Sequence, residues 1–350
     1  MIVCIVAGGS GTRLWPISTS DYPKHLIKVN SDEKSLLQNT YERARRLSDK
    51  IYVVTEDGHA HHIREQIADL PKENFIVEPD RRGTASCTVA ALAYISKRHG
   101  KDEPVAIISA DHLVRDMVGF THSLKVAAAA SYTQKRIVMI GIEPDYPSTG
   151  FGYIKKSKVF DENSLLYEVD SFKEKPDYNT ALKYVRSGRY LWNCSYLVGS
   201  VNTILDRMKR FAPYLVEDYE RLLNAKNKQE YNEIYLGFET NSIDYALLDF
   251  VDDLMVVPAS FDWMDLGSFG DLHKAVGGDV NGNYTRGDVE LDGVENSYIE
   301  NNGDVPVAVI GLDNVVVINT KDGILVARKD LGQKVGEIAK KIAKRGSPTT

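Results

Sequence analysis

The sequence is poor in cysteine and has no long apolar run. Only three cysteines occur among 350 residues, at positions 4, 87 and 194. Their wide spacing argues against a disulfide framework and against a cysteine-based zinc site, so we expect a reducing, cytoplasmic setting. The apolar run that opens the chain, MIVCIV, is far shorter than the core of a signal peptide or a membrane span. We therefore predict no export and no membrane partner.

The chain also lacks an excess of positive charge. Its formal net charge is −6 and its pI is about 5.8. A protein whose main partner is a nucleic acid usually carries a broad surplus of Lys and Arg, so we exclude that class. Any phosphate that binds must then be met by a few local cations. With 43% hydrophobic residues, the chain can bury a full core in one large domain and a smaller one.

The pattern of apolar residues indicates two structural regimes. Up to about residue 141, β-branched runs such as IVCIVA, IYVVT and VAIISA alternate with helical stretches. This alternation predicts an α/β fold, a Rossmann-like doubly wound mixed sheet with helices on both faces. Between residues 150 and 270 the expected elements are antiparallel strands near Tyr153 and Phe172 and helices after Asp177, Val201 and Ser242.

The last part of the chain reads as a separate β-rich module. From about residue 277, brief apolar runs are punctuated by DG, NNGD and KDG, which is typical of short strands joined by turns. We predict a β-helix-like module followed by an amphipathic helix from Gly332 to Lys344. The predicted domains are 1–276 and 277–350. Exposed strand edges in the module favour pairing with a neighbouring chain or with the main domain, and we expect a homodimer.

A glycine-rich stretch, AGGSGTRLWPISTSDYPKHL, follows the first apolar run. At the carboxyl end of a strand, backbone N–H groups of such a turn can approach phosphates closely. Leu14 replaces the third glycine of GxGxxG, and the GKS/T ending of a P-loop is absent. The alternative is a plain tight turn with two basic side chains in water. The residues of this stretch predicted to bind the nucleotide are Ala7, Gly8, Gly9, Gly11, Arg13 and Lys24.

Further motifs recur in a familiar order: EPDRRGTA, SADH, TGFGYI, FKEKP, WN, SIDYALL and WMDLGS. With the glycine-rich stretch, they make the sequence resemble the sugar nucleotidyltransferases over essentially the whole chain. The nucleotide-diphospho-sugar transferase fold is therefore expected. Three positions depart from the family pattern: Gly83 where Asn is frequent, Ser109 where Pro is common, and Ser195 where Gly is usual.

The resemblance implies that GTP and mannose 1-phosphate react to give GDP-mannose and pyrophosphate. The attacking sugar phosphate is already ionised at neutral pH, so no general base is needed. The enzyme must bring two anions into line and neutralise the charge that moves to the leaving group. The resemblance places Arg13 on the triphosphate and Lys24 near the reacting phosphates. Alternatives are thymidylyl or adenylyl transfer to glucose 1-phosphate, or a noncatalytic subunit that binds sugar nucleotides.

Two acidic residues far apart in the chain are the expected metal ligands. Asp111 follows the strand VAIIS, and Asp265 lies in WMDLG. The resemblance pairs both carboxylates on one Mg²⁺, an ion that prefers oxygen ligands. Taken singly, Asp111 could cap a helix or a turn, and Asp265 could be an ordinary loop aspartate. Asp111 is also expected to contact the nucleotide.

The resemblance places sugar recognition in the second half of the chain. Its site residues there are Gly152, Glu174, Lys175 and Asn193, with Lys175 on the sugar phosphate. For the base we predict that Glu78, with the backbone around Gly83, accepts the two adjacent donors of guanine. A structural glutamate at the strand end is an equal alternative. His59–His62 is expected to be a solvated helix face, and His112 to orient its neighbours rather than bind metal.

Overall fold

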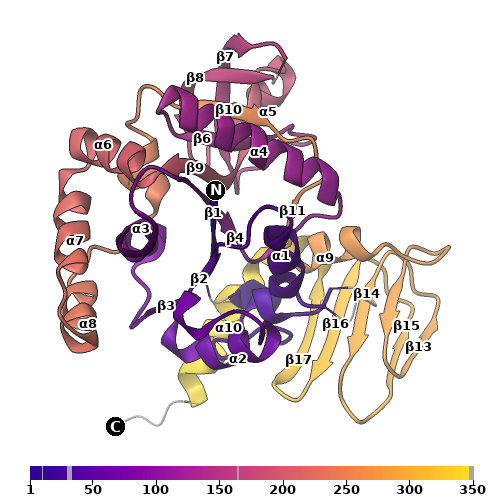
Figure 1. The fold of residues 1–350 in the computed structure, drawn as a ribbon. Coiled ribbons are helices and arrows are strands. Elements are labelled where there is room, and N and C mark those ends of the chain that lie inside the picture. Colours follow the sequence, from indigo (N-terminus) through magenta and orange to yellow (C-terminus); the bar gives the residue numbers. More distant parts are fainter. Residues whose placement is uncertain (10, 30–33, 164, 347–350) are drawn as a thin grey trace.

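A nine-stranded mixed sheet forms the centre of the chain (Figure 1). The computed structural model describes residues 1–9, 11–29, 34–163 and 165–346. The strand order is β3-β2-β1-β4-β9-β6-β10-β8-β7. The first four strands in this order are mutually parallel, whereas β9 runs antiparallel to both β4 and β6. Their bounds are β1 Ile2–Ala7, β2 Ile51–Glu56, β3 Phe75–Glu78, β4 Pro104–Ser109, β6 Val138–Ile142, β7 Gly152–Asp161, β8 Leu166–Lys173, β9 Tyr190–Ser200 and β10 Met255–Pro258.

Helices cover both faces of this sheet, as Figure 1 shows. Side chains alternate along a strand, so Ile2 and Cys4 of β1 pack toward α3, α6 and α7, while Val3 and Ile5 pack toward α1 and α4. Burial on both faces explains why this strand is almost continuously apolar. The helices are α1 Leu36–Arg45, α2 Ala60–Gln66, α3 Gly83–His99, α4 Met117–Gln134, α5 Tyr178–Ser187, α6 Val201–Phe211, α7 Pro213–Leu223 and α8 Lys228–Leu236.

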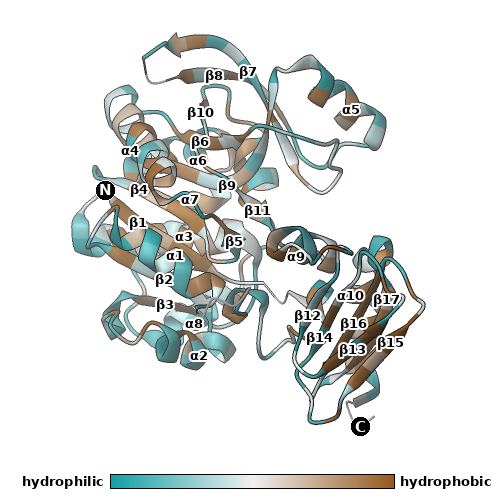
Figure 2. Cartoon of the chain, turned by 90° about the vertical axis from the view of Figure 1, so that its right-hand side faces the viewer, coloured by the Kyte–Doolittle hydropathy of each residue, from teal (hydrophilic) through white to brown (hydrophobic). Residues whose placement is uncertain are grey.

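The C-terminal region is a coil of short strands that alternates between two small sheets (Figure 2). One sheet has the order β12-β14-β16-β17, with the first three strands parallel, and the other pairs β13 with β15 in parallel. Asn319 Nδ2 donates to Asn301 Oδ1 at 2.9 Å, which links successive turns of the coil. The strands are β12 Tyr284–Arg286, β13 Val289–Asp292, β14 Tyr298–Asn301, β15 Val307–Ile310, β16 Val315–Thr320 and β17 Gly323–Arg328.

Both main fold predictions, the mixed α/β sheet and the β-helix-like module with its terminal helix, are confirmed. The terminal helix α10 spans Val335–Gly346, so its predicted start at Gly332 was too early. Residues 329–334 form a 3₁₀ helix, η6, instead. The domain bounds 1–276 and 277–350 stay a prediction. No helix within the described ranges is both long and apolar enough to cross a membrane.

One apolar cluster joins the C-terminal module to the glycine-rich stretch. Leu14 lies in η1 (Thr12–Leu14), Phe269 opens α9 (Phe269–Val276), and Val335 opens α10. These three side chains are buried in the same cluster as Tyr298 and Ile318 of the module. The two regions therefore share a core beside the carboxyl ends of the central strands.

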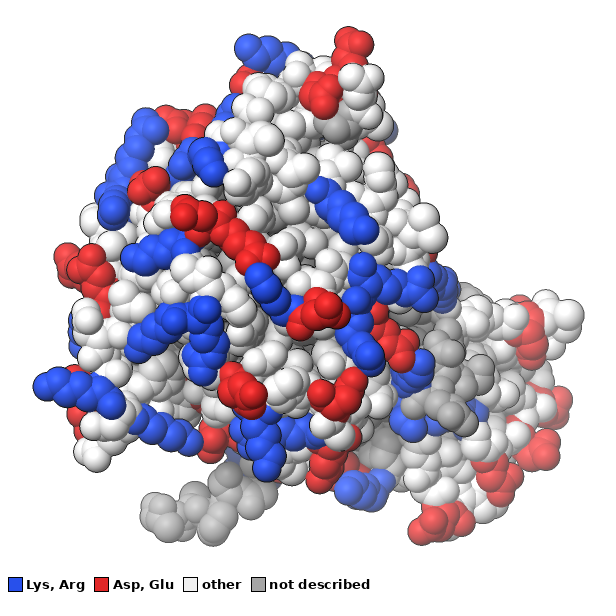
Figure 3. All heavy atoms as spheres, in the orientation of Figure 1, with Lys and Arg blue, Asp and Glu red and all other residues white. Residues whose placement is uncertain are grey.

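On the face shown in Figure 3, Lys and Arg are interspersed with Asp and Glu.

Candidate active site

Two adjoining cavities lie where the glycine-rich stretch meets the second half of the chain. The larger, here called the main cavity, has a volume of about 910 Å³. The smaller, the loop cavity, measures about 280 Å³. Arg13 and Gly267 line both of them. Of the predicted site residues, the loop cavity also holds Gly9, Gly11, Lys24 and Asp111, and the main cavity Gly152, Glu174, Lys175, Asn193 and Asp265.

The glycine-rich stretch closes tightly over Lys24. Gly11 has φ 55°, in the left-handed region, and a Cβ there would lie 2.6 Å from Cβ of Lys24. Any side chain at this position would push the loop away from the lysine, so the sequence needs glycine here. Gly9 also has positive φ, at 94°. Lys24 is only 6% exposed and is one of the residues that line the loop cavity.

Lys24 connects the two predicted metal ligands. Its Nζ lies 3.0 Å from Asp111 Oδ2 and 2.5 Å from Asp265 Oδ1. A two-residue strand pair, β5 (His112–Leu113) with β11 (Met264–Asp265), sets this arrangement, because Asp265 stands opposite His112 in the antiparallel register. Two carboxylates separated by more than 150 positions in the sequence therefore meet around one cation.

The charges of this triad stabilise one another. Burial disfavours the charged form of Lys24, but the charges of Asp111 and Asp265 outweigh it, and the pKa of the lysine is raised. For Asp111 and Asp265, burial likewise opposes ionisation, and the charge of Lys24 outweighs it, so the pKa of each carboxyl is lowered. At neutral pH, two negative charges therefore face one positive charge. This surplus of one negative charge favours the binding of a further cation at this point.

The donor set at this point fits Mg²⁺. Oxygens of Asp111 and Asp265 both lie within 3.0 Å of a single point, now held by the Lys24 ammonium. Among the described residues, no group of three or more His, Cys, Asp or Glu side chains gathers in a metal-binding arrangement. Mg²⁺ commonly takes one or two protein carboxylates and completes its shell with water and substrate phosphates. Two converging carboxylates suit that pattern, and the ion itself stays a proposal.

At the other end of the main cavity, Asn193 is held in one orientation. Its Nδ2 donates to Asp244 Oδ1 at 2.8 Å, and its Oδ1 accepts the backbone N–H of Ser195 at 2.9 Å. These partners fix which edge of the amide donates and which accepts. Ser195 has φ 58°, a left-handed conformation that glycine adopts without strain. This geometry explains why glycine is usual here in the family that the sequence resembles.

Glu174 presents an unpaired oxygen beside Asn193. Its Oε2 is buried and has no hydrogen-bond partner among the described residues. A Cβ on Gly152 would lie 2.3 Å from this oxygen, so a larger residue at position 152 would displace the carboxylate. The other oxygen, Oε1, lies 3.1 Å from Lys175 Nζ. A buried acceptor without a partner is costly, and a ligand hydroxyl would satisfy it.

Asp244 is a functional candidate that the sequence analysis did not assign. It is 8% exposed, and burial together with the nearby charge of Glu174 raises its pKa to about 6. The residue lies in the quoted motif SIDYALL, in a turn of π-helix over Asp244–Leu248. The signal available was a lone aspartate in an apolar segment. Its partner Asn193 is 51 positions away, which no local pattern reveals.

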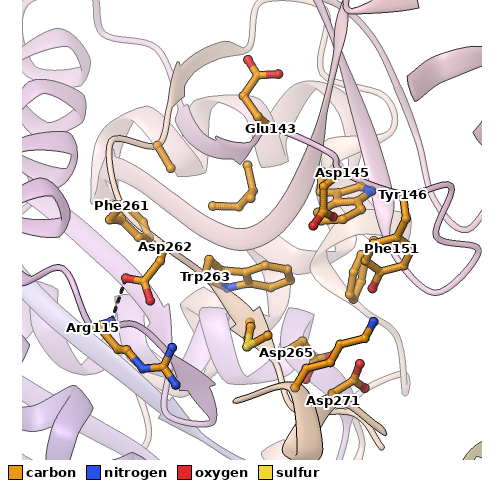
Figure 4. Close-up of a pocket in the computed structure, with 15 residues that line it drawn as sticks. Arg115, Glu143, Asp145, Tyr146, Phe151, Phe261, Asp262, Trp263, Asp265 and Asp271 are labelled. Atoms are coloured by element: carbon orange, nitrogen blue, oxygen red, sulfur yellow. Dashed lines mark hydrogen bonds between the residues drawn. The ribbon is translucent and has the colours of Figure 1, made fainter. Parts of the chain in front are cut away.

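Aromatic side chains line a third cavity of about 400 Å³ (Figure 4), and Tyr146, Phe151 and Trp263 among them also line the main cavity. The ring of Phe151 meets Trp192 and Trp263 edge to face, with centroids 5.2 Å apart in both pairs. The indole Nε1 atoms of both tryptophans are buried without a hydrogen-bond partner among the described residues. Tyr146 also packs on Trp192. The sequence analysis quoted both tryptophans within motifs but did not assign these aromatic side chains.

The structure does not bring Glu78 to either cavity. Glu78 is the last residue of β3 and is 6% exposed. Its carboxyl is buried and accepts a hydrogen bond from the hydroxyl of Tyr235. Burial raises its pKa to about 7. This geometry favours the structural alternative for Glu78, because its side chain contacts Tyr235 of α8. Its role in reading guanine stays a prediction. Gly83 opens α3, and a Cβ there would lie 2.1 Å from the carbonyl oxygen of Asn241.

Two histidine predictions have different outcomes. His112 Nδ1 lies 3.2 Å from the Tyr196 hydroxyl, and its Nε2 lies 3.8 Å from Asp111 Oδ1, which suits an orienting role. The stretch His59–His62 was expected to be solvated. However, His59 is buried and its Nε2 contacts the Ser20 carbonyl at 2.7 Å, so only part of that stretch faces water.

Comparisons with known proteins agree with this architecture. A nucleotidyl transferase family model matches residues 2–281, and a model of the mannose phosphate isomerase/GMP-like β-helix domain matches residues 289–342. An Escherichia coli mannose-1-phosphate guanylyltransferase is 33% identical over 349 residues, 97% of this chain and 75% of that protein. The alginate biosynthesis protein AlgA of Pseudomonas fluorescens is 34% identical over 363 residues, 100% of this chain and 73% of that protein.

A solved structure is similar over nearly the full length. It is described as a mannose-1-phosphate geranyltransferase from Thermus thermophilus. It superposes with a TM-score of 0.87 at 28% identity, covering 98% of this chain and 99% of that one. Both the central sheet and the C-terminal module are therefore part of one recurring architecture.

Proposed function

The chain belongs to the nucleotidyl transferase family, and we propose that it joins GTP and mannose 1-phosphate to form GDP-mannose and pyrophosphate. Membership implies a nucleoside triphosphate and a sugar phosphate as substrates; the choice of guanine and mannose is the proposal. The contact of Lys24 with both Asp111 and Asp265, beside the glycine-rich stretch, is the observation that carries it. The full-length similarity to a guanylyltransferase of E. coli supports the substrate pair.

In the proposed mechanism, the sugar phosphate oxygen attacks the α-phosphorus of the nucleotide and pyrophosphate leaves. Arg13 meets the triphosphate with its planar guanidinium group, and Lys24 holds a positive charge next to the reacting phosphates. Lys175, at the sugar end of the main cavity, binds the attacking phosphate. These cations bring two anions together and offset the charge that moves to the leaving group. No side chain has to remove a proton from the nucleophile.

Asp111 and Asp265 would hold Mg²⁺ in this mechanism. A bound Mg²⁺ supplies positive charge to the reacting phosphates. Lys24, whose Nζ lies between the two carboxylates, would then be beside the phosphate oxygens. Lys24 and the ion would occupy the same position between the carboxylates. Before substrate binds, the positive charge of Lys24 therefore offsets the repulsion between the two carboxylates.

Sugar recognition rests on Glu174 and Asn193. The unpaired Oε2 of Glu174 can accept a hydrogen bond from a sugar hydroxyl, and the oriented amide of Asn193 can both donate and accept hydrogen bonds. Asp244 acts as a positioning residue, because its carboxylate fixes the donating edge of that amide.

The proposal includes a homodimer and a cytoplasmic setting. Apolar side chains on the edge strand β17, Ile324 and Val326, are 66% and 64% exposed, which supports pairing of the module with a second copy. Light scattering at micromolar concentration tests this directly. A single species of 39.1 kDa would refute the dimer.

Pyrophosphate release tests the proposed reaction. Purified protein is incubated with mannose 1-phosphate or glucose 1-phosphate and with GTP, ATP, dTTP or UTP, each with and without Mg²⁺. We expect the highest kcat/KM for GTP with mannose 1-phosphate, and no turnover without the ion. Higher kcat/KM for dTTP or ATP with glucose 1-phosphate would instead favour the alternative nucleotidyl transfer. Loss of all turnover would favour a noncatalytic subunit, although Arg13, Lys24, Asp111 and Asp265 all line the two cavities.

A further inference from the structure

The side chain of Arg13 lies in a slot formed by distant parts of the chain. On one side is Gly267, where a Cβ would lie 3.4 Å from Nη1 of the arginine. On another side is Gly336 in α10, where a Cβ would lie 3.2 Å from Cγ of the arginine. Both glycines let a neighbouring backbone approach the side chain closely. Two separate segments therefore leave room for this guanidinium group and confine its stem.

A third wall of the slot is a polar side chain from the C-terminal module. Arg13 Nη1 donates a hydrogen bond to Gln333 Oε1 at 3.3 Å. Gln333 lies in η6, directly before α10, and it lines the main cavity. It therefore contacts the arginine from the same space that the substrates enter.

The segment that carries Gln333 is itself anchored. Val335, two residues on, is 4% exposed and packs in the cluster that contains Leu14, next to Arg13 in the sequence. Gly332, one residue before Gln333, approaches Ser268, with its virtual Cβ 3.4 Å from Cβ of that serine. The backbone around position 333 is thus fixed against both the glycine-rich stretch and the loop that carries Asp265.

We propose that Gln333 is a positioning residue for Arg13, so that the C-terminal module completes the phosphate-binding site of the central sheet. A long arginine side chain has many rotamers, and ordering it costs conformational entropy. A neutral amide oxygen restrains the guanidinium group without competing for charge with a polyphosphate. The module thereby prepares Arg13 for the β- and γ-phosphates before the nucleotide binds. This inference rests on the proposed function of Arg13.

The test compares variants of the full-length protein. Gln333→Met keeps the length of the side chain but removes the acceptor, and Gly336→Ala places a methyl group against the arginine stem. We expect each to lower kcat/KM for the nucleoside triphosphate by about three- to tenfold, the usual net effect of one ordinary hydrogen bond, with KM for the sugar phosphate unchanged. Binding of inorganic pyrophosphate with Mg²⁺, measured by calorimetry, should weaken by a similar factor.

The matched control is Glu337→Gln, a change at an exposed position of α10 that should leave both KM values and the melting temperature as in the wild type. Wild-type values for Gln333→Met in both assays would overturn the proposal. An equal rise in both KM values with a lower melting temperature would also overturn it, since that pattern indicates a structural role only. If the wild type turns over no substrate pair, the proposed function fails, while pyrophosphate binding still tests the role of Gln333.

Discussion

Replacing Lys24 by methionine should separate its role in catalysis from its role in holding two carboxylates together. Two unit charges about 3 Å apart attract by roughly 5 kcal/mol at an effective dielectric constant near 20. The side chains of Asp111 and Asp265 are 31% and 23% exposed, so solvent screens part of this attraction. Burial of the lysine offsets a further part. We expect Lys24→Met to lower the free energy of unfolding at pH 7 by about 2–3 kcal/mol.

The pH dependence of stability should change sign in this variant. In the wild type, the pKa of each carboxyl is held below its unfolded value, so their contribution is present above about pH 4 and is lost as the pH falls through the folded values. Without the lysine, two neighbouring carboxylates repel and the pKa of at least one of them rises. Acidification from about pH 7 to pH 5 should then stabilise Lys24→Met.

Magnesium provides a second readout that a general loss of packing would not move. With the ammonium group removed, Asp111 and Asp265 are left free to bind a cation, so Mg²⁺ should raise the melting temperature of Lys24→Met more than that of the wild type. Pyrophosphate release should nevertheless fall by about 10²-fold or more, because a preorganised charge is lost. Lys125→Met, a change at an exposed position of α4, is the matched control. If Mg²⁺ stabilises wild type and Lys24→Met equally, the reasoning about this triad is refuted.

Four other substitutions, at three positions, follow from single observations. Asp244→Asn keeps the acceptor for Asn193 but removes a carboxyl whose pKa is raised to about 6. The wild type loses stability as this carboxyl ionises between about pH 4 and pH 6, and the variant does not. In urea unfolding at pH 8, the variant should therefore be more stable by about 1–3 kcal/mol. Asp244→Ala should instead raise KM for the sugar phosphate, and equal KM values for both variants would contradict its positioning role. Ser195→Gly relieves a left-handed backbone and should raise stability by about 0.5–1 kcal/mol in thermal unfolding, a loss being the contrary result. Glu78→Gln should leave the ratio of kcat/KM for GTP and ATP unchanged and stabilise the protein above about pH 7, whereas a collapse of that ratio would restore the base-reading hypothesis.

The parts of the site that could be predicted from sequence are those fixed by strand ends. Asp111 follows a buried strand directly, and the glycines follow another, so their place at the carboxyl edge of the sheet is a matter of local pattern. The place of Asp265 at that edge was predicted only from the resemblance. It depends on the strand pair β5–β11, which is two residues long and too short to give a recognisable sequence pattern.

The parts that escaped prediction depend on contacts between distant segments. Strand alternation decides whether Glu78 points to the cavity or to the core, and a four-residue strand gives too little pattern to tell. The hydrogen bond between Asn193 and Asp244 and the contacts around Arg13 join segments far apart in the chain. No sequence pattern indicates that these segments meet. For this reason, the contact of the C-terminal module with Arg13 could not be predicted from the sequence, whereas the β-strand content of the module could.

The most direct test of the account is pyrophosphate release by Asp111→Asn and Asp265→Asn across a Mg²⁺ titration. Each change keeps the size of the side chain and removes one of the two charges that face Lys24. The account predicts that each variant loses about 10²-fold or more in kcat and needs more Mg²⁺ for half-maximal rate. Wild-type kcat and Mg²⁺ dependence in either variant would contradict the claim that these two carboxylates and Lys24 form the reaction centre.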